Sequence, residues 1–272
     1  MHDNGAGADL SVASLLFEPG DRAGAEEVRA LALSDPSFMI SLDPQEGQAA
    51  AGSPASSPKK AGRGAAPDPP QQDRWLELLA NGLTFDLQGL SPGLPQVLPP
   101  YAYAYGLPVG LSTAPLEAIS LRPGPHIAAG GRMLPVVRGL AWLTAVLAAL
   151  PQVRAVAWHA ARTWSAPDHF RGSVLRWVEG GAFPGLGLTA LAPTPEGGLQ
   201  SEGLALFTGQ ELRLAPELAF DRASGARLAL RLLHWLVENG KLEVPAELSG
   251  PSGEPLKLVP TENRRFVGVL RR

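Results

Sequence analysis

Residues 201–214, S-E-G-L-A-L-F-T-G-Q-E-L-R-L, and the helical pattern that follows them constrain the fold more than any other part of the chain. The stretch 211–214 alternates polar and apolar residues, which is typical of a half-exposed strand. Asp221 stands where the N-cap of the next helix belongs, and Asn239-Gly240 is a common helix end. One side of that helix carries four apolar residues at helical spacing: Leu228, Leu232, Trp235 and Leu236. A strand followed by an amphipathic helix indicates a protein with both α and β structure.

The first part of the chain predicts alternating strands and helices. Residues 11–18 and 38–42 have the composition of strands, and residues 26–31 between them have a helical pattern. The apolar residues of 75–79 indicate a short helix that ends at Asn81-Gly82, and a strand is expected at 83–87. A strand at 116–121, a helix at 136–150 and a strand at 153–159 together predict a β-α-β unit.

The second part of the chain predicts one more helix and two hairpins. Ser165 is expected to cap a helix that has Pro167 and Asp168 in its first turn and ends at Gly180-Gly181. Strands at 186–191 and 199–207 flank a glycine- and proline-rich turn, and strands at 256–259 and 265–270 form a terminal hairpin.

The sequence therefore predicts an α+β fold, with a mixed or antiparallel sheet and helices packed on it. The chain has 272 residues, of which 45% are hydrophobic, enough for one compact domain over residues 10–272. Residues 44–72 interrupt this domain as a disordered insertion, because they consist mainly of small residues, proline and glutamine. Its cations Lys59, Lys60 and Arg63 keep the insertion hydrated or contact an anionic partner.

Charge and cysteine usage exclude several classes of function. The net charge of −3 comes from interspersed charges, which argues against a nucleic-acid surface, and the chain has no cysteine for disulfides, zinc ribbons or a thiol nucleophile. Residues 1–9 lack the apolar core of a secretory signal, so a cytoplasmic location is expected. The apolar run 134–150 contains Pro135 and Arg138, which favours a buried core helix over a membrane span. We expect no membrane contact.

Three stretches together resemble the bacterial family called domain of unknown function 4261. They are L-L-F-E-P near the start, A-W-L-T-A-V-L-A-A-L-P-Q-V-R-A-V-A-W-H, and G-L-A-L-F-T-G-Q-E-L-R-L before the helix A-R-L-A-L-R-L-L-H-W-L. The resemblance covers residues 116–239 and extends more weakly to 11–42. The chain has Thr208 before Gly209 where the family usually has a further glycine. The resemblance implies a compact α+β domain of a bacterial cytoplasm and carries no established activity.

Every tyrosine of the protein lies in the tract Tyr101-Ala102-Tyr103-Ala104-Tyr105, inside a proline-rich connection at 91–115. In an extended segment, period-two spacing places Tyr101, Tyr103 and Tyr105 on one face, which suits stacking on a flat ligand or docking of a partner protein. The alternative is a long loop that its aromatic residues pin to the domain.

A second candidate site is an anion pocket of His159, Arg162 and Ser165. His159 ends a predicted strand, and the free amides near Ser165 begin a helix, a common place for anions. The alternative is a histidine whose ring is satisfied by backbone at the rim of the sheet. No spacing of the five histidines suits a metal site, no cofactor motif is present, and Ser165, His169 and Asp168 are too close in sequence to form a triad. We therefore expect no metal, no cofactor and no catalytic residue.

These observations favour a non-catalytic domain that acts through protein–protein contacts, by a sheet edge or by the tyrosine tract. The alternative is an enzyme or a small-ligand protein with an anion pocket at His159 and Arg162.

Overall fold

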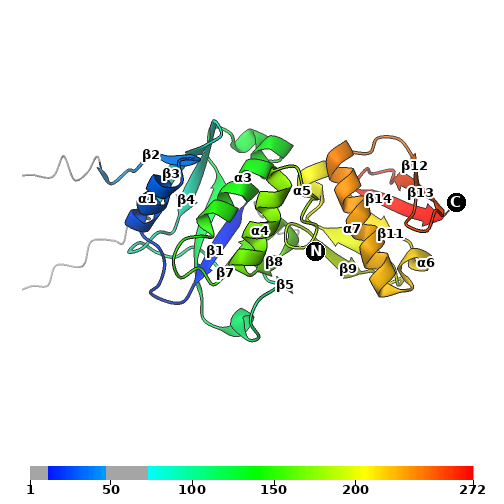
Figure 1. Cartoon of the computed structure of the whole chain (residues 1–272), viewed down its shortest axis with the longest axis horizontal. Coiled ribbons are helices and arrows are strands. Elements are labelled where there is room, and N and C mark those ends of the chain that lie inside the picture. The colour runs from blue at the N-terminus through cyan, green and yellow to red at the C-terminus, as the bar shows by residue number, and fades with distance from the viewer. Residues whose placement is uncertain (1–11, 47–72, 272) are drawn as a thin grey trace, which may run out of the picture.

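The computed structural model describes residues 12–46 and 73–271. The predictions for residues 1–9, and for residues 47–72 of the insertion with Lys59, Lys60 and Arg63, lie outside this range. The predicted α+β class is confirmed, because helices pack on two sheets in one body (Figure 1).

The larger sheet has eight strands in the order β2-β3-β4-β6-β1-β7-β8-β5. Only β5 and β8 are parallel neighbours, and the other pairs are antiparallel. Strand β1 lies between β6 and β7 and is antiparallel to both, so β6 and β7 run parallel to each other. They form the predicted β-α-β unit, with β1 inserted between its two strands. The strands are β1 (Ala13–Phe17), β2 (Phe38–Leu42), β3 (Trp75–Ala80), β4 (Leu83–Gln88), β5 (Tyr103–Tyr105), β6 (Glu117–Pro123), β7 (Ala155–Trp158) and β8 (Thr163–Ser165).

The smaller sheet has six strands in the order β12-β13-β14-β11-β10-β9. Its β11–β14 pair is parallel, and the predicted pairings β9–β10 and β13–β14 are confirmed, although β9 begins at Ala190 and not at residue 186. The strands are β9 (Ala190–Pro193), β10 (Leu199–Glu202), β11 (Glu211–Leu214), β12 (Ala246–Ser249), β13 (Pro255–Pro260) and β14 (Phe266–Arg271). The strand predicted at 199–207 stops at Glu202, because the backbone turns at Gly203 and residues 205–208 form a short helix.

The helices α1, α3 and α4 lie on one face of the eight-stranded sheet, and α7 lies on the six-stranded sheet (Figure 1). Asp221 caps α7 as predicted, since its carboxylate accepts hydrogen bonds from the amides of Ala223 and Ser224. No helix among residues 12–46 and 73–271 combines the length and apolarity needed to cross a membrane. The α-helices are α1 (Ala25–Ser34), α3 (Leu134–Leu147), α4 (Pro167–Val178), α5 (Ala205–Thr208), α6 (Pro216–Ala219) and α7 (Arg222–Asn239), and the short 3-10 helices are η1 (Leu111–Thr113), η2 (Ala128–Gly130) and η3 (His159–Ala161).

The helix predicted at 75–79 is wrong, because these residues form strand β3. Leu76, Leu78 and Ala80 are buried and the residues between them are half-buried, which is the two-residue period of a strand. Asn81 and Gly82 both have positive φ and join β3 to β4 as a two-residue hairpin turn. Asn-Gly thus marks a hairpin here and not a helix end.

Candidate functional site

The tyrosine tract forms the edge strand β5, but its three rings do not share one face. The amides of Ala102 and Tyr103 both donate to the carbonyl of Arg162, at 2.9 and 3.2 Å, so two residues oppose one and the strand bulges. Tyr101 therefore lies on the face of the sheet opposite to Tyr103 and Tyr105. There its ring contacts that of Trp164, with 5.0 Å between the ring centroids. The expectation of one aromatic face is wrong because the bulge shifts the alternation.

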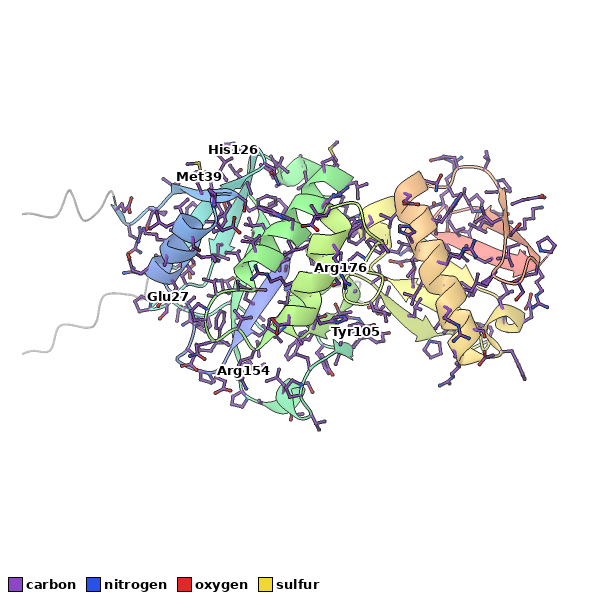
Figure 2. All side chains as sticks on the ribbon, viewed as in Figure 1. Glu27, Met39, Tyr105, His126, Arg154 and Arg176 are labelled. Carbon is purple, nitrogen blue, oxygen red and sulfur yellow. The ribbon has the colours of Figure 1, made fainter. Side chains whose placement is uncertain are left out.

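Tyr103 and Tyr105 are half-buried and contact the protein itself. The Tyr103 hydroxyl donates to Glu202 at 3.3 Å, and burial, with Glu202 second, raises the pKa of Tyr103. The ring of Tyr105 stacks on that of His169 in the first turn of α4, with 6.4 Å between the ring centroids, and Figure 2 shows Tyr105 near the N-terminal end of that helix. Tyr101, which is exposed, is therefore the tyrosine best placed to meet a partner.

The connection before and after the tract exposes apolar side chains. Of the large hydrophobic residues exposed in the described part of the chain, five lie within this connection: Leu94, Val97, Leu98, Tyr101 and Val109. We call these five residues the 94–109 surface. The sequence has no charged residue between Asp86 and Glu117, so the exposed apolar groups have no charged neighbours along the chain. These five exposed side chains are gathered in one connection, and groups of exposed apolar residues mark interaction sites more often than isolated ones do.

The guanidinium of Arg22 holds the base of this connection. It donates to the carbonyls of Gly89 and Gly93 and forms an ion pair with Glu117 at 2.7 Å. The Arg22 side chain is only 8% exposed, and Arg22 lowers the pKa of Glu117 by hydrogen bonding. A buried arginine that bridges two carbonyls and a carboxylate thus fixes the backbone at Gly89 and Gly93, just before the 94–109 surface.

Leucines on the far side of the connection anchor it to the sheet. A small separate cluster of buried residues forms under it, with Leu107 packed against the cluster. The members of this cluster are Leu16, Leu111, Leu116, Ala118, Ala155, Ala157 and Trp164. The inner side of the connection is thus held to the domain by leucines, while the outer side is exposed.

The residues of the predicted anion pocket lie close together in sequence but contact different groups. Nε2 of His159 lies 2.9 Å from Oγ of Ser14, which in turn lies 2.9 Å from Oγ of Ser120. Arg162 forms a two-contact ion pair with Glu202, which raises the pKa of Arg162. The guanidinium is thus already neutralised by a carboxylate that the sequence pattern did not identify, since Glu202 lies in the other sheet.

Ser165 does not cap α4, so that prediction is wrong. Ser165 pairs with Val156 inside the sheet, its side chain is 1% exposed, and the N-cap is Ala166. Pro167 and Asp168 do occupy the first turn as predicted. Because its hydroxyl is buried under the helix layer, Ser165 has no route to an external anion.

Ser14 and His159 form the hydroxyl–imidazole contact that hydrolases use for nucleophilic attack. Ser14 is only 1% exposed, so a substrate does not reach its hydroxyl. A cavity of about 530 Å³ lies at the start of α7, and neither Ser14 nor His159 lines it. Among residues 12–46 and 73–271, no group of three histidine, aspartate or glutamate side chains has the geometry of a metal site. The anion pocket stays a prediction, and the contacts of Arg162 and Ser165 favour the 94–109 surface over it.

Comparisons with known proteins find no matching family model, no matching curated protein and no matching solved structure.

Proposed function

We propose that this protein is a non-catalytic domain that acts through protein–protein contacts at the 94–109 surface. The observation that carries the proposal is the exposure of five large apolar side chains on a segment without a single charge. The proposal includes a cytoplasmic location and membership of the family of domain of unknown function 4261, as the sequence resemblance implies.

Two physical arguments support this function. The free energy falls by about 25 cal/mol for each Å² of exposed apolar area that a partner removes from water. The Arg22 contacts and the leucine anchors already order the backbone, so association costs less conformational entropy than it would for a flexible loop.

The test removes apolar area from residues that contribute nothing to the core. Val97 and Val109 are almost fully exposed, so we expect Val97→Ser with Val109→Ser to keep the Tm within about 2 °C of the wild type. Tagged wild-type and variant proteins are purified from cells of the source, and each co-purifying protein is then titrated in purified form. We expect at least about tenfold weaker binding by the variant.

A matched control carries Leu33→Ser with Val244→Ser, which changes the same kind of exposed side chain outside the surface. This control is expected to bind as the wild type does. Equal binding by the Val97/Val109 variant and the wild type would contradict the proposal. Because the surface is uncharged, raising the salt concentration is expected to leave the binding almost unchanged.

A further inference from the structure

The free edge of β5 carries one unused pair of backbone hydrogen-bonding groups. Tyr103 donates its amide to Arg162, and Tyr105 accepts from the amide of Ala166, so both residues turn their backbone toward β8. In a strand, alternate residues turn their N–H and C=O to opposite sides. Ala104, which is exposed, therefore presents its N–H and C=O to the side where β5 has no neighbour.

A single residue facing the edge suits pairing with an identical strand. When two copies of β5 pair as antiparallel strands about a two-fold axis at Ala104, each Ala104 donates its N–H to the carbonyl of the other. The two backbones would then lie at the usual spacing of paired strands, about 4.8 Å.

The segment that carries β5 has no charge of its own, and the charged groups beside Tyr103, Arg162 and Glu202, pair with each other, which favours a second copy over a charged partner. A two-fold interface brings residues near the axis against their own copies, so any charged group there would meet a like charge. No charged residue occurs from 87 to 116, which includes β5 and both of its flanks. Tyr101, Leu98 and Val109 are exposed in the single chain, so they are apolar side chains that such an interface could bury beside the pair of hydrogen bonds.

The other edge strands of the two sheets carry features that oppose such pairing. Pro193 is part of β9, Glu247 is part of β12, and the register of β2 is interrupted between Ile40 and Leu42. Proline, charge and irregular register are the usual means by which proteins protect sheet edges. Strand β5 is short and follows a bulge, which leaves Ala104 as the one residue of β5 that faces the edge, but its three residues carry neither a proline nor a charge.

We infer that a second copy of this chain occupies the 94–109 surface, with the two β5 strands paired across a two-fold axis at Ala104. This inference rests on the proposed function, because it names the partner for the same surface.

The decisive variant is Ala104→Pro, measured by analytical ultracentrifugation of the full chain from about 1 to 100 µM. Proline removes the N–H that faces the free edge, while the bonds from β5 to β8 use the neighbouring residues. We expect the wild type to reach twice the mass of one chain and Ala104→Pro to self-associate at least about tenfold more weakly. The control Ala104→Ser keeps the N–H and is expected to dimerise like the wild type.

A second variant keeps the test decisive if Ala104→Pro does not fold. Val109→Asp, at an almost fully exposed site, places two like charges in the interface and is expected to prevent dimers. A wild type that stays monomeric throughout, or dimers that both variants form with unchanged affinity, would overturn the inference. A third outcome separates the two proposals. If the wild type is monomeric but binds another protein, and Val97→Ser with Val109→Ser weakens that binding, the second copy is refuted and the proposed function stands.

Discussion

At the scale of single residues, Glu211 holds together the strand, turn and short helix of the stretch 201–214. Its two carboxylate oxygens accept the amides of Gly203, Leu204 and Ala205 at 2.9, 3.2 and 3.1 Å, and also the hydroxyl of Ser201. One carboxylate on β11 thus satisfies the backbone amides at the turn between β10 and α5. Burial nevertheless raises the pKa of Glu211, since the cost of desolvation exceeds what these four hydrogen bonds return.

We predict that Glu211→Gln lowers the free energy of unfolding by about 1–3 kcal/mol, because an amide group replaces an oxygen that accepts two hydrogen bonds. The raised pKa also fixes the sign of the pH dependence. The contribution of Glu211 to stability is fully present below the pKa of the unfolded glutamate, about 4.3, and is lost as the pH rises through the raised pKa of the folded state. Glutamine does not titrate, so the difference in the free energy of unfolding between the wild type and Glu211→Gln, measured in urea, should narrow from pH 4 to pH 7. A difference that widens with pH would contradict this assignment.

At the scale of elements, the sequence predicts those helices and strands whose ends depend on neighbouring residues, and it fails where contacts distant in sequence decide the structure. Asp221 begins α7 as expected, because an N-cap acts on amides two and three residues away. Asn81-Gly82 was misread as a helix end, since the same dipeptide serves a hairpin and only pairing with β4 decides between them. The tyrosine tract was found from composition, but the bulge at Arg162 and the contact with Glu202 depend on residues distant in sequence.

Gly203 offers a test of how tightly the turn after β10 packs. Its φ is +90°, and an added Cβ would lie 2.8 Å from the Cβ of Ala161 in η3 and about as close to the Ala161 backbone. We predict that Gly203→Ala lowers the free energy of unfolding by about 2 kcal/mol or more, through the positive φ and this close contact together.

The control is Gly20→Ala, where φ is +88° and an added Cβ meets nothing within 4 Å. This control should cost only the strain of the positive φ, about 1 kcal/mol. Guanidinium unfolding of both variants measures the difference, and equal losses would show that the approach of Ala161 contributes nothing.

At the scale of the whole molecule, an aromatic cluster makes the two sheets share one core. Phe207 of α5 lies 6.2 Å from Trp158 of the larger sheet, 6.0 Å from Trp177 of α4 and 5.0 Å from Phe183, measured between ring centroids. The buried hydrophobic residues around it form one cluster that includes strands of both sheets. A shared core couples the unfolding of the two sheets, since neither can expose its side of the cluster alone.

We predict that the wild type unfolds in urea as one transition, with far-UV circular dichroism and tryptophan fluorescence coinciding, as one domain over residues 10–272 requires. Phe207→Ala removes the ring that contacts both sides of the cluster, so it should lower the free energy of unfolding by about 3–5 kcal/mol. Phe220→Ala removes the same side chain from an exposed site and should leave the transition almost unchanged. Two separate transitions in the wild type would mean that each sheet folds with its own helices and that the aromatic cluster is only a contact between two domains.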